Sequence, residues 1–189
     1  MSRKSYVSRL RVLDFDIENR PLAYLGQDFT TADVTAIAAG FVGEGKIHCW
    51  LLGQHSSKGM LLGFRRMYDA ADIVTGHYIR KHDLPILNGA MVEAGLPPLA
   101  PKLTSDTKLD FITSVGISES QENLSQMYGL DAGKEHMSNA SWREANRLTP
   151  AGLRRTRARV VGDVTQHMAL RVTMVKRGHL GRPRMWSPL

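Results

Sequence analysis

The sequence has little of what would mark a disulfide-rich, zinc-binding or membrane protein. Its 189 residues include one cysteine, Cys49, so an intramolecular disulfide is excluded and a reducing cytoplasm is the expected location. There is no CxxC motif and no Cys/His cluster, which argues against a zinc site. No apolar run reaches the roughly 20 residues of a membrane span, and the basic N-terminus lacks the apolar segment of a secretory signal. These absences favour a soluble cytoplasmic protein.

Acidic residues are scarce in the C-terminal part of the chain. The formal net charge is +7, and from Ala151 to Leu189 there are nine lysines and arginines but a single acid, Asp163. Two interpretations are open. One is a polyanionic partner, DNA or RNA, and the other is a solvated basic helix and tail.

Length and composition indicate one globular unit. Hydrophobic residues make up 42% of the chain and charged residues 23%, which is typical of a soluble domain with a substantial core. We expect a single domain over residues 1–177. The Gly- and Pro-containing segment 178–189 is expected to be an extended or mobile basic tail.

Hydrophobic periodicity predicts alternating strands and helices. The first three strands form an expected antiparallel meander, with Gly43-Glu44-Gly45 as a hairpin turn. The predicted strands cover 12–17, 33–41, 46–52 and 71–76, and 105–112 is either a fifth strand or an irregular link. The predicted helices cover 57–70, 83–94, 119–127, 142–148 and 151–176. This order predicts an α/β fold in which helices flank a mixed sheet of three antiparallel strands followed by parallel strands.

The first predicted strand ends in carboxylates. Because alternate strand residues share a face, Asp16 and Glu18 project together, while Phe15 and Ile17 point into the core. Two acids on one strand face repel each other, and a divalent cation would relieve this repulsion. The alternative is a solvated polar face. Asp14 lies on the same face, so Asp14 and Asp16 form a rival pair.

Two further acids follow later in the chain. A predicted strand ends at Gly76, and Asp83 begins the next helix. Ligands gather at this end of open α/β sheets. Asp83 is alternatively a helix N-cap. Asp163 is the sole acid among the arginines of the last helix, and a surface salt bridge is its alternative explanation.

Taken in order, these acids resemble the DEDD superfamily of 3′-5′ exonucleases, the DnaQ-like branch of the ribonuclease H-like fold. The resemblance spans about residues 10–170. The matching segments are Phe15-Asp16-Ile17-Glu18, Gly76-His77-Tyr78 with His82-Asp83, and Asp163-Val164, with weaker echoes at Asp106-Thr107, Ser120–Leu124 and Lys134. Stand-alone phage proteins of this family have a similar size. The resemblance is therefore compatible with a phage origin, and the expected location is then the host cytoplasm.

The resemblance implies metal-dependent hydrolysis of phosphodiester bonds. Two Mg²⁺ or Mn²⁺ ions would be bridged by Asp16, with Glu18 and Asp163 on the ion that activates water and Asp83 assisting the other through water. The implied partner is a single-stranded DNA or RNA 3′ end, with a polymerase or replication protein as a further candidate.

The chain departs from the family pattern at several positions. Tyr78 replaces an Asn, and His82 replaces an aromatic residue. At the last motif, Arg159 occupies the place of the Tyr of one subfamily, and Ala158 that of the His of the other. These are the residues that position the attacking water in the family.

The water-orienting residue is therefore open. His167 lies one helical turn after Asp163 on the same face, His77 and His82 are weaker candidates, and Arg159 is a candidate cation for the scissile phosphate. The alternative function is a ribonuclease H-like nucleic-acid-binding or polymerase-accessory protein with weak or lost catalysis. An endonuclease or resolvase of the same fold is a third possibility.

Overall fold

The computed structural model describes residues 10–23, 29–112, 116–130 and 136–188, with backbone only for 21–23 and 29–32. Lys134 lies outside these ranges. One six-stranded sheet has the order β3-β2-β1-β4-β5-β6. The strands are β1 (Val12–Ala23), β2 (Phe29–Phe41), β3 (Ile47–Leu51), β4 (Ile73–Gly76), β5 (Lys102–Asp106) and β6 (Arg184–Trp186). The pairs β1–β2, β2–β3 and β5–β6 are antiparallel, and β1–β4 and β4–β5 are parallel.

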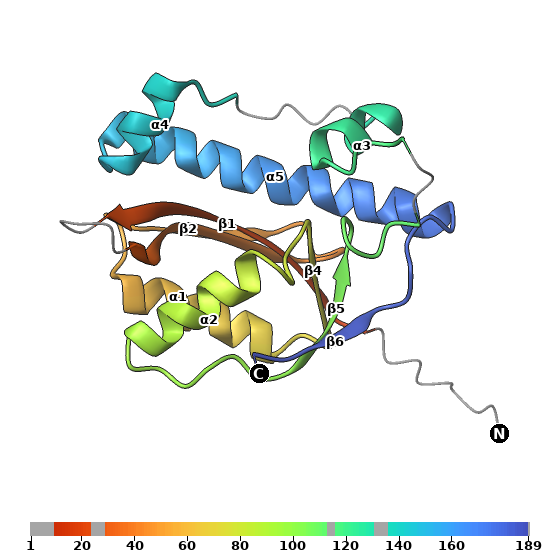
Figure 1. Cartoon of the computed structure of the whole chain (residues 1–189), viewed down its shortest axis with the longest axis horizontal. Helices are drawn as coiled ribbons and strands as arrows, with labels where there is room; N and C mark the ends of the chain where they lie inside the picture. Colours follow the sequence, from red (N-terminus) through yellow and green to blue (C-terminus); the bar gives the residue numbers. More distant parts are fainter. Residues whose placement is uncertain (1–9, 24–28, 113–115, 131–135, 189) are drawn as a thin grey trace.

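Helices cover both faces of the sheet (Figure 1). On one face lies α5 (Pro150–Lys176), with α3 (Gln121–Met127) and α4 (Asn139–Asn146) beside it, and on the other lie α1 (Ser57–Asp69) and α2 (Asp83–Glu93). No helix in the described ranges is long and apolar enough to span a membrane. The predicted mixed α/β sheet of an antiparallel meander followed by parallel strands is confirmed.

The two faces of β1 differ in chemistry. Leu13, Phe15 and Ile17 are buried against α1 and α2 in the main core. The alternate residues face α5 instead, as the strand period requires. On β2, Ala36 and Ala38 are fully buried beneath Val160 and Val164 of α5. These small residues allow the helix to pack close to the sheet, which places its side chains beside the acids of β1.

Local signals account for the starts of the helices. Ser56, Ser120, Ser138 and Thr149 each accept a hydrogen bond from a backbone N–H of the first turn that they cap. Pro150 follows Thr149 as the first residue of α5, where a missing N–H costs little. In contrast, α2 is capped by His82 without a side-chain hydrogen bond, so Asp83 is not an N-cap.

The bounds of several predicted segments differ from those of the structure. The first strand, predicted over 12–17, continues through Pro21 to Ala23. Beyond Asp14 the described part of β1 pairs with β2 alone, and a proline, which lacks a backbone N–H, is tolerated in a strand with one paired side. The fifth strand is Lys102–Asp106 rather than 105–112. The segment 178–189, whose separation from the domain stays a prediction, contains β6, which pairs with β5 and buries Trp186.

Candidate functional site

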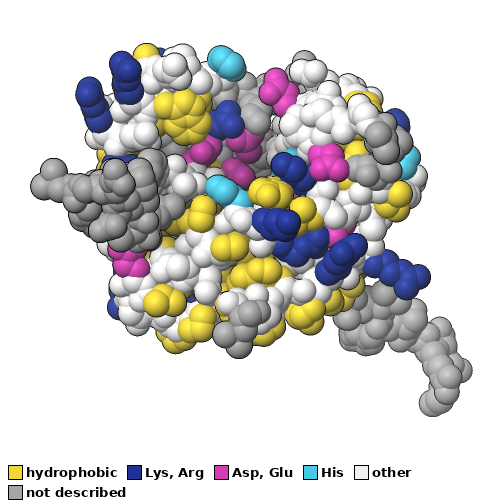
Figure 2. Space-filling model, viewed as in Figure 1, with side chains coloured by type: hydrophobic (Ala, Val, Ile, Leu, Met, Phe, Trp, Pro, Cys, Tyr) yellow, Lys and Arg dark blue, Asp and Glu magenta, His cyan; other side chains and the backbone are white. Residues whose placement is uncertain are grey.

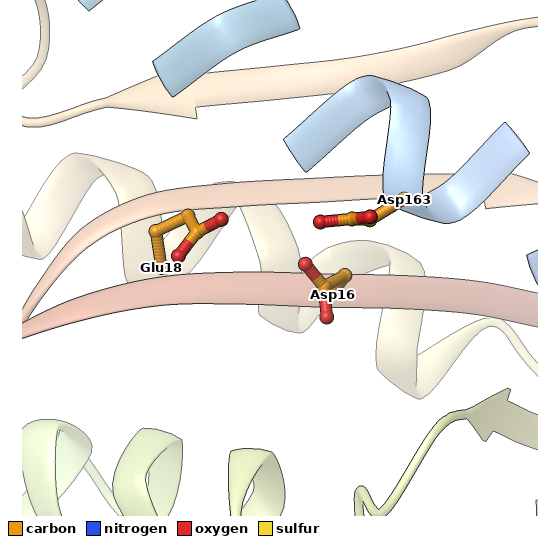
Figure 3. A group of neighbouring side chains, drawn as sticks. All are labelled: Asp16, Glu18 and Asp163. Atoms are coloured by element: carbon orange, nitrogen blue, oxygen red, sulfur yellow. The ribbon is translucent and has the colours of Figure 1, made fainter. Parts of the chain in front are cut away.

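Three carboxylates meet where α5 crosses β1. Asp16 and Glu18 come from alternate positions of the strand, and Asp163 comes from the helix above them. Figure 3 shows the three side chains turned toward a common point, and one carboxylate oxygen of each lies within 4.8 Å of the other two. Oxygen ligands at this spacing suit a hard divalent cation.

The fourth predicted acid, Asp83, lies in the same cleft. It is buried in the first turn of α2, and its Oδ1 accepts a hydrogen bond from the Ile17 backbone N–H at 3.3 Å. His82 lies beside it, with Nδ1 3.4 Å from the Asp83 Oδ2. The hydrogen bond to Asp83 raises the pKa of His82. Burial raises the pKa of Asp83, and the hydrogen bond to His82 lowers it.

A cleft of about 410 Å³ contains all four acids. Figure 2 shows acidic side chains in a hollow on this face of the molecule, with hydrophobic, basic and histidine side chains around it. Its lining includes His77, Tyr78, His82, Lys108, Gln121 and Arg159. A cleft of this size accommodates a nucleotide-sized ligand.

Repulsion among the acids disfavours their charged forms in this cleft. The pKa of Asp16 is well above its ordinary value of 3.8 because of burial, and then because of the negative charges of Asp83, Asp163 and Glu18. Arg159 acts in the opposite direction. A bound cation would remove much of this repulsion, and an all-carboxylate donor set fits a hard metal ion.

Arg159 connects two of the acids. Its Nε lies 3.0 Å from the Glu18 Oε1, and its Nη2 lies 3.5 Å from the Asp163 Oδ2. The guanidinium also lies 5.6 Å from the ring centroid of Trp142 on α4. The salt bridge considered for Asp163 therefore exists, but Asp163 is buried in the cleft instead of lying at the open surface.

His167 lies away from the other candidates. Among the described residues, the cleft lining does not include it, and its side chain is buried. Its Nδ1 is hydrogen-bonded to the Asp14 Oδ2 at 2.7 Å, and its Nε2 to the Thr107 Oγ1 at 2.8 Å. Thr107 is also hydrogen-bonded to the His77 Nδ1 at 3.0 Å, so a polar chain links buried Asp14 to a residue of the cleft.

The spacing of two secondary structures explains this arrangement. Four residues of helix advance about 6 Å, and two residues of strand advance about 6.6 Å. Asp163 therefore lies beside Asp16, and His167, one turn later, lies beside Asp14. The rival pair Asp14 and Asp16 is separated in the same way: Asp14 contacts His167, and Asp16 faces the cleft. Burial raises the pKa of Asp14, and His167 partly offsets the shift.

Lys108 and Gln121 contribute to the cleft but were not predicted from the sequence. Lys108 follows β5, whose carboxyl end is adjacent to that of β4, and the Asp106-Thr107 pair is the signal that could have located it. Gln121 begins α3, and its Nε2 donates to the backbone oxygen of Asp163 at 3.1 Å. No local pattern indicates a contact between residues so far apart in the chain.

Comparison with known proteins supports the fold assignment. No protein-family model matches the sequence, and no curated protein matches it. Among solved structures, the family B DNA polymerase from the hyperthermophilic archaeon Pyrobaculum calidifontis is similar, with a TM-score of 0.71 and 17% sequence identity. The likeness covers 88% of this chain but 25% of the polymerase, so the chain spans about a quarter of that protein's length. The protein thus has a mixed α/β fold of the ribonuclease H-like kind.

Proposed function

We propose that this protein is a metal-dependent 3′-5′ exonuclease that hydrolyses phosphodiester bonds of DNA or RNA with two Mg²⁺ or Mn²⁺ ions. The observation that carries the proposal is the convergence of Asp16, Glu18, Asp83 and Asp163, from three separate elements, on one cleft. Gathering like charges in a partly buried site opposes folding, and such clusters are characteristic of functional sites.

Two broader properties support nucleic acid as the substrate. The fold is similar to part of a DNA polymerase, and the chain carries a net charge of +7. Exposed arginines near the start of α5, Arg154, Arg155 and Arg157, are available to attract a phosphate backbone. Cations bound by the acids of the cleft would then neutralise the charge of the phosphate that is being hydrolysed.

Each acid has a role in the proposed site. Asp16, whose carboxyl is affected by the charges of the other three acids, would bind both ions. Glu18 and Asp163 would help to hold one ion, and Asp83 would help to hold the other. When bound, the ions would supply a nucleophile at neutral pH and charge relief at the leaving oxygen. Arg159, already held by Glu18 and Asp163, would be positioned to contact the scissile phosphate as a fixed cation.

The test is the shortening of a labelled single strand. With Mn²⁺, the wild-type protein is expected to release mononucleotides from a 3′-labelled strand, and Asp16→Ala is expected to abolish release. Glu93→Gln, an exposed acid on α2, is the matched control and should retain full activity. Mn²⁺ should also raise the Tm of the wild type and of Glu93→Gln but not that of Asp16→Ala. Equal activity of the wild type and Asp16→Ala would refute the site.

One observation favours a second function. Arg159 supplies positive charge to Glu18 and Asp163 where the resemblance leads us to expect a tyrosine or histidine nearby. A ribonuclease H-like nucleic-acid-binding or polymerase-accessory protein with weak or lost catalysis would have this property. Salt-sensitive binding of oligonucleotides without cleavage in Mg²⁺, Mn²⁺ or Ca²⁺ would identify it.

A further inference from the structure

Tyr78 and Lys108 form an aromatic and cationic wall of the cleft. Tyr78 follows β4 and Lys108 follows β5, and the parallel pairing of Gly76 with Asp106 brings the two loops together. The Lys108 Nζ lies 4.3 Å from the centroid of the Tyr78 ring, and both residues line the cleft that contains the acids. Both side chains are only partly buried, so a ligand in the cleft can contact them.

A single buried carboxylate holds the backbone of both residues. Asp106 Oδ1 accepts hydrogen bonds from the backbone N–H groups of Tyr78 at 2.9 Å and of Lys108 at 3.0 Å. Its Oδ2 accepts a third from the Arg80 N–H at 3.1 Å. The backbone from which the ring and the ammonium project is therefore held in place before any ligand binds. Preorganisation of this kind lowers the entropic cost of binding.

The backbone of Tyr78 is strained. Its φ of 69° lies in the left-handed region, which a bulky side chain seldom occupies. Glycine would adopt this conformation without strain. A large aromatic residue at a position suited to glycine, beside a cluster of acids, is a form of strain that accompanies functional sites. The strain at Tyr78 therefore makes its ring a candidate for contact with a ligand in the cleft.

We infer that Tyr78 and Lys108 bind the terminal nucleotide of a single-stranded nucleic acid. The Tyr78 ring stacks on the base, and the Lys108 ammonium contacts a phosphate. The base must be free of its own pairing partner to reach the ring, so this subsite selects single strands over blunt duplexes. The inference deepens the proposed function and rests on it for the choice of ligand, but it concerns binding and can be tested without cleavage.

The first experiment compares stability with binding. A 3′-terminal 2-aminopurine oligonucleotide, as DNA and as RNA, is titrated with Ca²⁺ in place of Mg²⁺, and its fluorescence and anisotropy are recorded. Tyr78→Gly removes the ring and relaxes the backbone. We expect a Tm no lower than that of the wild type, with binding about tenfold weaker and quenching of the terminal base lost. Tyr78→Phe keeps the ring and should bind within about twofold of the wild type.

The second experiment isolates the base and the phosphate. On a strand whose 3′-terminal position is abasic, Tyr78→Gly and the wild type should bind equally, because no base is present to stack. Lys108→Met should lower the slope of log Kd against log salt by about 0.7, the value for one phosphate contact on a single strand.

The outcomes separate this inference from the exonuclease itself. Unchanged quenching in Tyr78→Gly, or an equal loss of affinity for the normal and the abasic strand, would overturn it. If Tyr78→Gly is less stable than expected, the comparison of the two strands within that variant, below its Tm, still decides the question. Stacking without cleavage in any metal would instead overturn the proposed function and leave the subsite intact.

Discussion

Asp16 has three acidic neighbours in the cleft, Asp83, Asp163 and Glu18, and all three disfavour its charged form. Burial has the largest effect on its pKa and acts in the same direction. The folded protein therefore binds a proton at Asp16 more tightly than the unfolded chain does. Without a bound cation, the folded environment therefore disfavours the carboxylate form of Asp16, which is the form that a cation would need as a ligand.

The consequence is a specific pH dependence of the metal-free protein. The unfolded pKa is near 3.8 and the folded pKa lies well above it, so the folded state holds more protons between these values. The contribution of Asp16 to stability is then favourable below about pH 4 and is lost as the pH rises through the folded pKa. Asp83, whose pKa is also raised by burial, acts with the same sign.

Replacing Asp16 by asparagine should remove this penalty. In EDTA at pH 7 we expect Asp16→Asn to have a higher Tm than the wild type, by roughly 2–4 °C for each kcal/mol recovered. The difference should vanish below about pH 4, where the wild-type carboxyl is protonated. Thermal unfolding followed by circular dichroism from about pH 3 to about pH 8 measures the difference, with the exposed Asp69→Asn as control. A lower Tm at pH 7 would contradict the expectation.

The helix α5 has two separate functions. It buries Val160 and Val164 on the sheet, and it places Asp163 above β1. At its first turn it crosses α4, where Gly152 allows the two backbones to approach closely. At its middle, Gly162 precedes the acid and has no close neighbour. The two glycines therefore differ in purpose although they lie on one helix.

Alanine substitutions at these glycines should have opposite effects. In Gly152→Ala the new Cβ would meet the backbone of Glu144 and would lie 2.6 Å from the Ala145 backbone nitrogen, so α4 must shift. We expect destabilisation of about 1–3 kcal/mol. In Gly162→Ala no heavy atom lies within 4 Å of the new Cβ, and improved helix propensity should stabilise the protein by up to about 1 kcal/mol. Urea unfolding of both variants measures the difference, and equal effects would contradict the proposed role of the α4–α5 contact.

At the scale of the whole molecule, the C-terminal segment completes the sheet. β6 pairs with β5, Trp186 is buried in the main core, and the Arg184 Nε lies 3.3 Å from a carboxylate oxygen of buried Asp110. The boundary between a domain over 1–177 and a tail over 178–189 remains a prediction from sequence. The contacts of β6 indicate how it can be tested.

Truncation after Arg177 should destabilise the whole fold. It removes Trp186 from the core and leaves β5 as an exposed edge, so we expect a loss of at least about 3 kcal/mol. Removal of residues 188–189 alone serves as the control and should change the free energy of unfolding little. Chemical denaturation of the three chains decides the matter, and an unaltered stability after the larger truncation would support the sequence-based boundary.

Much of the fold followed from local patterns. Alternation along β1 separated Phe15 and Ile17 from Asp16 and Glu18, and capping residues such as Thr149 marked the start of α5. These features depend on residues that are a few positions apart in the chain. Their conformational preferences can therefore be predicted without knowledge of the tertiary structure. The strand β6 could not be predicted from the sequence. It has three residues with Gly and Pro nearby, and it forms through pairing with β5, so no local pattern indicates it.

The sequence by itself determined the mixed α/β architecture, because period and order are properties of the chain, and its resemblance to the exonuclease family is what predicted a site built from the four acids. Tertiary structure alone decided which side chains share a cleft. The advance of α5 along β1 set His167 against Asp14 instead of in the cleft and brought Arg159 to Glu18, and the pairing of β4 with β5 put Lys108 over Tyr78. Each of these contacts joins residues distant in the chain, and only the packing of a helix on a strand or of one strand beside another fixes their separation.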